Sequence, residues 1–324
     1  MLRGTHTNSP AGTEATSLPV GMRRSRSAGA GPQEANPSDG GWWAGSVETG
    51  GMELPPLLSA KPYGEPSVFE PANLLREARR QRGLPEVPVP AVCLLDPDGD
   101  IVRHLTATGR ASAHEGWACY HTTLWVFDLD GTEVGVIGCA VGASFAVLLA
   151  EQLFVSGCEL LVSVTSSGSI TRVAEPPHFV VIDRALRDEG TSLHYLAPSD
   201  WSPAPRHLVD GVSGRLGGLA QEVVVGSTWT TDAPYRETRA SIDRAASLDV
   251  VAVEMEAAAL YAFAAAKGRD VLCLAHVTNT MAVAGDDFEK GEADGAIDAL
   301  ELVAAVVAAL CSPASDGPGA RVEE

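Results

Sequence analysis

Between about residues 88 and 312, short apolar runs alternate with longer segments whose apolar positions recur every three or four residues. Short apolar runs bounded by turn residues are typical of buried strands, and the longer period is that of helices with one buried face. This alternation predicts one α/β domain, a three-layer α/β/α sandwich whose mixed central sheet is covered by helices on both faces. The expected strands are 91–95, 119–127, 132–140, 159–165, 178–183, 222–227, 249–254 and 270–278, and the expected helices are 144–157, 204–218, 236–247, 256–267 and 293–311.

The ends of the chain have a different pattern. Residues 1–60 are rich in Gly, Ser, Pro, Ala and Thr without apolar periodicity, which predicts a disordered extension. Residues 61–87 form an N-terminal helical segment with one expected helix, Glu70 to Arg82, and residues 313–324 are expected to be a flexible tail. The domain itself is therefore assigned to residues 88–312.

Charge and composition narrow the range of partners. Lys and Arg number 23 against 42 Asp and Glu, which gives a formal net charge of −19. Such a surface repels nucleic-acid phosphates and anionic lipids, so neither a nucleic acid nor a membrane is expected as a partner. No apolar run has the roughly 18 residues of a membrane span, and a cytoplasmic location is expected. The six cysteines lack metal-ligand spacing, which favours buried reduced thiols and no metal site.

Candidate chemistry begins at VAVEMEAAALYAFAAAKG, where an expected strand runs directly into an alanine-rich helix. Glu254 and Glu256 flank Met255 at this junction, and the carboxyl ends of strands are where α/β sheets bind ligands. Two acids beside an apolar side chain suit a sugar, with hydroxyls for the carboxylates and a ring for the methionine. The alternative is that Glu256 only caps the helix.

VEMEAAALYAFA resembles the ribose-binding signature of the nucleoside phosphorylase and uridine phosphorylase family. GCAVGASFAVLLAEQL resembles that family's glycine-rich turn before a helix, and RDEGTSLHY (187–195) is similar to uridine phosphorylases in particular. HVTNTMA places Asn279 where purine enzymes of the family carry an Asp that protonates the leaving base, and uridine phosphorylases carry Asn there. The resemblance covers nearly all of 91–310 and favours the pyrimidine branch.

The resemblance implies roles for single residues. Glu256 would hold the ribose 2′- and 3′-hydroxyls beside Glu254, and Met255 would pack against the sugar. Arg236 would stabilise negative charge on the leaving base. The remaining candidates for substrate contact are Tyr235, which either stacks on the substrate or fills the core, Asn279, Arg187 and His194.

The expected phosphate site departs from the family pattern. In LLDPDGDIVRHL, Leu95 replaces a glycine and the family's arginine falls near Gly99; a second arginine corresponds to Ser163, and a third, from a neighbouring subunit, falls near His121. Each charge-assisted contact to phosphate is worth roughly 1.5–3 kcal/mol, so three missing cations matter. Groups that could compensate are Arg103, Arg187 and His121, together with an anion cradle formed by the hydroxyls of Ser166 and Ser167 and the amide of Gly168.

Asp96, Asp98 and Asp100 crowd the same loop and would repel a phosphate dianion. Nucleosidases of the superfamily place an acid in this loop to activate water, whereas a plain solvated turn also suits the DPDGD residues. The leading hypothesis is a uridine-phosphorylase-like enzyme that transfers the pentosyl group of a nucleoside to phosphate, by a narrow margin. The alternatives are a nucleosidase with water as acceptor and a non-catalytic nucleoside-binding protein. No cofactor beyond phosphate is expected, and the resemblance implies a homo-oligomer, a dimer or hexamer.

Overall fold

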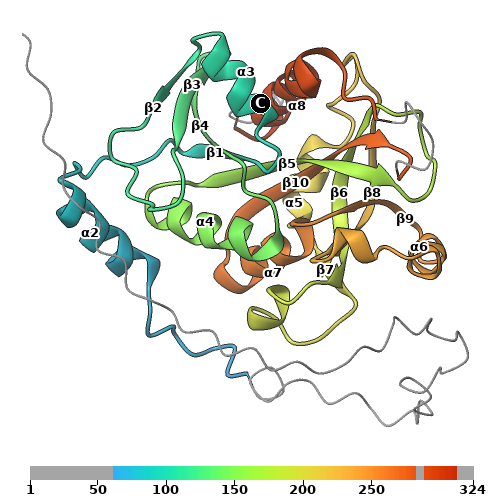
Figure 1. Ribbon diagram of the computed structural model, residues 1–324, viewed down its shortest axis with the longest axis horizontal. Coiled ribbons are helices and arrows are strands. Elements are labelled where there is room, and N and C mark those ends of the chain that lie inside the picture. The colour runs from blue at the N-terminus through green and yellow to red at the C-terminus, as the bar shows by residue number, and fades with distance from the viewer. Residues whose placement is uncertain (1–60, 282–287, 312–324) are drawn as a thin grey trace, which may run out of the picture. The chain divides into compact units, whose positions relative to one another are not determined.

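The computed structural model describes residues 61–281 and 288–311 (Figure 1). Their centre is one ten-stranded sheet in which the path β10-β6-β8-β9-β5-β1-β4-β3-β2 is hydrogen-bonded neighbour to neighbour, with β7 paired to β6. The bounds of the strands are β1 Val92–Asp96, β2 Ala111–Ala113, β3 Trp125–Leu129, β4 Thr132–Gly138, β5 Leu160–Ser169, β6 His178–Asp188, β7 Trp201–Pro203, β8 Val223–Thr231, β9 Val250–Glu254 and β10 Asp270–Asn279.

The sheet is mixed, as the sequence predicts. β1 lies parallel to β4 and β5, whereas β3 pairs antiparallel with β4 through a hairpin. The hairpin turns at Asp130 and Gly131, whose positive φ values of 51° and 87° suit an Asp-Gly turn. β10 pairs with both β5 and β6, so β5, β10, β6, β8 and β9 close into a ring at one end of the sheet.

Helices cover both faces of the sheet, which confirms the predicted α/β fold with three layers. In Figure 1, α4 and α7 lie on one side of β1 and β5, and α3 and α8 lie on the other. The helices are α2 Pro71–Arg82, α3 Asp100–Ala107, α4 Ala143–Val155, α5 Arg206–Val212, α6 Arg239–Ala246, α7 Ala257–Lys267 and α8 Ala296–Cys311, with 3₁₀ turns η1 Ser192–His194, η2 Pro234–Arg236 and η3 Glu292–Gly295.

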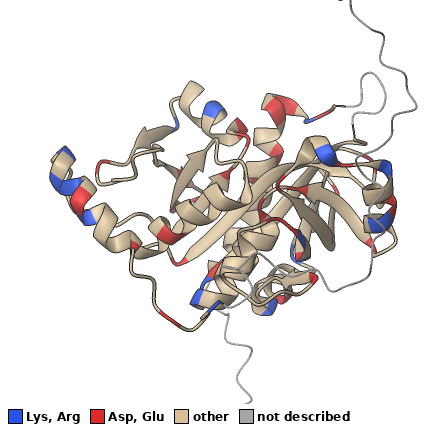
Figure 2. Cartoon of the chain, turned by 60° about the horizontal axis from the view of Figure 1, so that its bottom comes forward, with Lys and Arg blue, Asp and Glu red and all other residues tan. Residues whose placement is uncertain are grey.

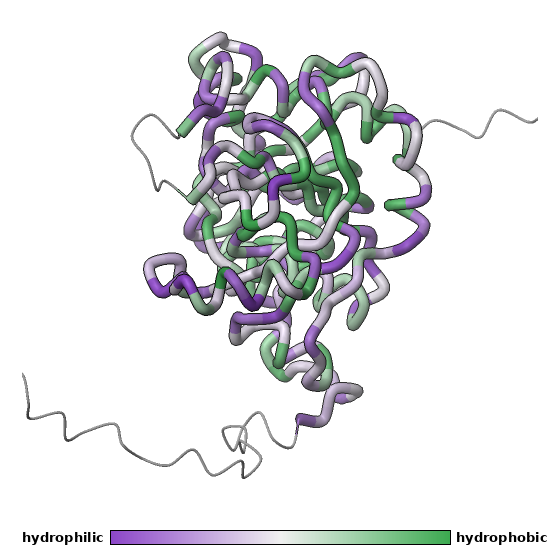
Figure 3. Tube along the Cα trace, turned by 90° about the vertical axis from the view of Figure 1, so that its right-hand side faces the viewer, coloured by the Kyte–Doolittle hydropathy of each residue, from purple (hydrophilic) through white to green (hydrophobic). Residues whose placement is uncertain are grey.

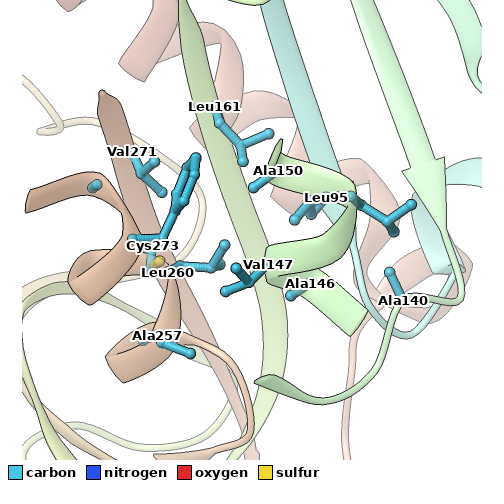
Figure 4. Packing of buried hydrophobic residues seen from close by; sticks show 14 of the residues in the cluster. Leu95, Ala140, Ala146, Val147, Ala150, Leu161, Ala257, Leu260, Val271 and Cys273 are labelled. Carbon is cyan, nitrogen blue, oxygen red and sulfur yellow. The ribbon is translucent and has the colours of Figure 1, made fainter. Parts of the chain in front are cut away.

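The two layers of helices bury separate apolar cores. Alternate residues of β1 face opposite sides: Leu95 packs with α4 and α7, while Leu94 packs with α3 and α8. Figure 4 shows the first core, where Val147 of α4 and Leu260 of α7 lie side by side in the same cluster as Leu161 of β5. In Figure 3, the apolar stretches of the chain accordingly concentrate toward the middle of the fold and the polar stretches toward its periphery. This packing holds α4 and α7 with their first turns at the same edge of the sheet.

The N-terminal helix α2 packs on the domain through Leu75 and Ala78. Pro71 occupies its first turn, and the helix ends at Gly83 in the left-handed conformation. Basic residues in its last turn, visible at the edge of the molecule in Figure 2, interact favourably with the negative C-terminal end of the helix dipole.

The structure corrects several predicted elements. The strand expected at 119–127 corresponds to β3, which begins only at Trp125. Cys119 and Leu124 lie in the loop before it, and their apolar side chains pack in the core from there. The helix expected at 204–218 ends at Val212, and the one expected at 236–247 is the 3₁₀ turn η2 followed by α6. The sequence pattern did not indicate β2, β7 or α3.

The missed helix α3 begins inside the DPDGD segment. Asp96 accepts hydrogen bonds from the amides of Gly99 (3.1 Å) and Val102 (2.9 Å) and so caps the first turn. Asp96 and Asp100 are buried, which contradicts the interpretation of this segment as a solvated turn. The assigned segments 1–60 and 313–324 lie outside the described residues.

Candidate active site

The strand-to-helix junction between β9 and α7 carries two buried carboxylates with different surroundings. Glu254 accepts hydrogen bonds from the amides of Glu256 and Ala257, both at 2.7 Å, and from the hydroxyls of Thr228 (3.0 Å) and Thr230. Burial raises the pKa of Glu254, and these donors oppose the rise. Both of its oxygens are occupied, so Glu254 caps α7.

Glu256 has one free oxygen. It is 1% exposed; its Oε1 accepts a hydrogen bond from the amide of Gly142 at 2.7 Å, and its Oε2 has no hydrogen-bond partner among the described residues. Burial, and then the charge of Glu254, raise the pKa of Glu256 to about 8; the Gly142 amide, and the Thr165 hydroxyl, which does not meet hydrogen-bond geometry, oppose this rise. A buried acceptor without a donor is costly, so this oxygen can accept a hydrogen bond from a hydroxyl of a ligand.

The carboxyl end of β5 connects the other candidates to Glu256. Thr165 lowers the pKa of Glu256, and the next residue, Ser166, donates its amide to the carboxylate of Asp98 at 2.8 Å. The carbonyl of Ser167 accepts a weak hydrogen bond from Asn279 Nδ2 at 3.5 Å. The charge of Asp98 also contributes to the raised pKa of Glu256. Three successive residues of one strand therefore bring Glu256, Asp98 and Asn279 together.

Ser167 and Gly168 complete this strand end. The Ser167 hydroxyl is buried and has no hydrogen-bond partner in the described part of the chain. A side chain on Gly168 would place its Cβ 2.7 Å from the sulfur of Met281 and 3.3 Å from Oδ1 of Asn279. A side chain at 168 would therefore force the Met281 side chain to shift and press on the Asn279 amide.

Asn279 lies at the end of β10 and is buried. Its Oδ1 accepts a hydrogen bond from the amide of Met281 (2.8 Å), and its Nδ2 also donates to the hydroxyl of Thr278 (3.3 Å). These contacts fix the orientation of the amide. A carboxamide in this position has no proton to transfer at neutral pH.

The loop between β1 and α3 concentrates negative charge. Burial, with the charges of Asp100 and Asp98, raises the pKa of Asp96 to about 7 against the amides of Val102 and Gly99. Asp100 pairs with Arg103 and with Nζ of Lys290, the latter at 2.6 Å. The cation predicted to compensate for missing phosphate ligands, Arg103, is thus bound to Asp100 and to the carbonyl of Asp98.

Other predicted residues lie in different surroundings. The Arg187 guanidinium donates to Ser192, to Ser199 and to the carbonyls of Leu196 and Ala197, so it holds the loop that follows β6. His194 contacts Lys61 and lines a groove of about 650 Å³ with Glu151 of α4.

Three of the remaining predicted residues, His121, Tyr235 and Arg236, are exposed. His121 places its ring edge-on to Phe145, with centroids 6.5 Å apart. Tyr235 is 99% exposed on η2, beside Arg236, so the core role considered for Tyr235 is wrong. Met255, next to Glu256, is half-buried.

Two contributions were missed from the sequence. The amide of Gly142 binds Glu256 from the first turn of α4, and the glycine-rich turn before that helix was the available signal. Lys290 reaches the Asp100 carboxylate from 190 residues away, and no local pattern indicates this contact. Among residues 61–281 and 288–311, no group of three or more His, Cys, Asp or Glu side chains is arranged to hold a metal. No helix in the same ranges is long and apolar enough to cross a membrane.

A sequence model of the phosphorylase superfamily matches residues 93–311, and the chain belongs to this superfamily. The match contains β5, the β9–α7 junction and the Asp98 loop described above.

The relatives with curated names are phosphorylases. The guanosine phosphorylase of Halorubrum lacusprofundi is 27% identical over 139 residues, which are 43% of this chain and 58% of that protein. A DeoD-type purine nucleoside phosphorylase of Brevibacillus brevis is 27% identical over 171 residues, or 51% of this chain and 73% of that protein.

Solved structures show the same fold. The uridine phosphorylase of Vibrio fischeri superposes with a TM-score of 0.60 at 18% identity, over 70% of this chain and 93% of that one. The purine nucleoside phosphorylase of Toxoplasma gondii, solved with immucillin-H, gives a TM-score of 0.60 at 14% identity, over 69% of this chain and 92% of that one.

Proposed function

We propose that this protein cleaves the N-glycosidic bond of a nucleoside. The observation that carries the proposal is the free Oε2 of Glu256, a buried acceptor beside the half-buried Met255. A ribose would supply hydroxyl donors to this oxygen and an apolar ring face to the methionine. The names of the two relatives described above, a guanosine phosphorylase and a purine nucleoside phosphorylase, support the same chemistry.

Glu256 would act through differential binding of the sugar. Hydroxyl donors favour the ionised carboxylate, because they replace the solvation that burial removes. As the glycosidic bond breaks, the sugar becomes positively charged, and charge-assisted hydrogen bonds to the carboxylate strengthen. The fixed contact to Gly142 orients the carboxylate before the substrate binds.

The leaving base would depart without a proton from Asn279. Its amide is oriented by Met281 and has no acidic proton, so the base must tolerate negative charge. This requirement favours a pyrimidine such as uracil as leaving group. In the proposal Arg236, exposed on η2, turns inward to face the base, and Tyr235 closes over it.

The geometry favours water as the acceptor. The Ser166 amide already binds the Asp98 carboxylate, which places a negative charge beside the Ser166 and Ser167 hydroxyls and the Gly168 amide that could cradle phosphate, and Arg103 is paired with Asp100. A phosphate dianion would have to displace one carboxylate beside two more, whereas water carries no charge and can donate to Asp98. Asp98 would then act as the general base, and no cofactor is needed.

Phosphorolysis is the second candidate, favoured by the relatives and by the buried, unpartnered hydroxyl of Ser167. Phosphate would take the Ser166 amide only after Asp98 has moved away. It would then attack the sugar carbon that carries the base, the same carbon that water attacks in hydrolysis.

A panel of purine and pyrimidine nucleosides, incubated with the purified protein, tests the proposal. We expect release of free base from at least one pyrimidine nucleoside, detected by chromatography. Glu256→Gln should lower this rate by about 100-fold, because one charge-assisted acceptor is lost in the transition state. Absence of base release from every nucleoside, with and without phosphate, contradicts the proposed function and favours a binding protein.

A further inference from the structure

Asp100, the first residue of α3, is held by two cations in different environments. The Asp100 side chain is 10% exposed, and each of its oxygens forms an ion pair. Arg103, one turn along the same helix, is 57% exposed, while Lys290 is 20% exposed with its Nζ 2.6 Å from Oδ2. Because water screens the arginine more than the lysine, Lys290 is the stronger restraint on Asp100.

Lys290 is itself fixed to the end of β10. The amide of Glu289 donates to the carbonyl of Thr278 at 2.8 Å, and Phe288 pairs with Asn279 in an antiparallel bridge. The backbone just before Lys290 is thus paired with the strand end that carries Asn279. Lys290 connects this strand end to the loop that carries Asp98.

We propose that Lys290 is a positioning residue for the acceptor site, which binds Asp100 and thereby keeps the Asp98 carboxylate on the Ser166 amide. The proposal rests on the proposed function for its effect on turnover, but its structural part does not. Three carboxylates in five residues repel one another, and an opposing cation that is only 20% exposed limits their separation. The charged and titratable groups around this loop are Asp96, Asp98, Asp100, Arg103, Glu256, His276, Lys290 and Asp294.

Lys290→Met removes the cation, and Lys290→Arg retains it. Hydrogen–deuterium exchange of the Ser166 amide reports directly on its bond to Asp98. We expect exchange about tenfold faster in Lys290→Met than in the native protein, and close to native in Lys290→Arg. Arg103→Met should have a smaller effect, and Lys267→Met, a half-exposed lysine on α7 away from this loop, should have none.

Turnover gives a second readout. In Lys290→Met, kcat should fall by about tenfold while KM for the nucleoside changes by less than about twofold, because Glu256 and Met255 still bind the sugar. Asp100→Asn should lower kcat to the same extent. If Lys290 acts by binding Asp100, the variant with both substitutions should lower kcat no further than either single variant. Asp100→Asn also replaces Lys290→Met if that variant does not fold.

Native exchange of the Ser166 amide in folded Lys290→Met, or in Asp100→Asn, overturns the proposal. So does a double variant with fully additive effects. If the native protein releases no base from any nucleoside, the proposed function fails, and amide exchange alone decides the role of Lys290.

Discussion

The carboxylate of Asp98 accepts a hydrogen bond from the backbone amide of Ser166, 68 residues later in the chain, at 2.8 Å. A backbone amide at the end of a buried strand is a natural donor to an external anion. Here the donor is satisfied by the protein's own acid. The contact supports our proposal that water is the acceptor, because a phosphate near this amide would meet a negative charge.

Asp98→Asn should lower hydrolysis by about 100-fold or more, because a general base contributes roughly that factor. The asparagine oxygen can still accept from Ser166, so the loop and the melting temperature should change little. Steady-state rates and thermal unfolding measure both effects. Asp243→Asn, at an exposed position on α6, is the matched control. A native rate in Asp98→Asn means that Asp98 does not activate water.

Glu256→Gln should stabilise the protein at alkaline pH. The pKa of Glu256 is raised from its ordinary 4.5 to about 8, so above pH 4.5 the folded protein holds a proton that the unfolded chain has lost. Native stability therefore falls, relative to the Gln variant, as pH rises from 4.5 to about 8, and the difference is constant above that. The difference should reach the order of a few kcal/mol. Denaturant unfolding at pH 5 and pH 8.5 measures it, and a pH-independent difference contradicts the raised pKa.

Glu254→Gln should have the opposite effect on stability. Its carboxylate satisfies four donors, and the amide group of a glutamine would face at least one of them with another donor. An unsatisfied buried donor costs about 1–3 kcal/mol, so the melting temperature should fall although one buried charge is removed. The two variants are isosteric and two residues apart, which makes each the control for the other. Equal effects in both would show that Glu254 does not cap α7.

Self-association is expected through the outer side of α4. Leu148 and Val155 are 39% and 44% exposed and stand seven residues apart on this helix, so they lie on one face. Val141, 51% exposed, precedes the same helix. Leu148→Glu should convert a dimer or larger assembly into a monomer in light scattering. A native protein that is monomeric at working concentration contradicts the predicted homo-oligomer.

Much of the fold could be predicted because its buried strands are short apolar runs with a clear period. β4 and α7 begin and end within two residues of their expected positions. The errors arose where tertiary packing replaces local pattern. The apolar Cys119 suggested a strand, but it packs in the core from a loop. Helix α3 begins in a segment rich in turn residues because Asp96 caps its first turn.

The candidate site was partly accessible from sequence. The two acids around Met255 could be placed at a strand end, but their different roles depend on donors from Thr230 and Gly142. These donors come from distant parts of the chain. The same holds for Lys290, whose contact with the acceptor loop exists only in the folded protein.

Whether water or phosphate accepts the ribosyl group is tested most directly by identifying the sugar product of the reaction. The protein is incubated with a nucleoside that it cleaves, in ¹⁸O-labelled water, with and without phosphate, and the sugar is identified by mass spectrometry. Our account predicts ribose labelled with ¹⁸O, formed at a rate that phosphate does not change. Base release that requires phosphate and yields unlabelled ribose 1-phosphate would contradict it.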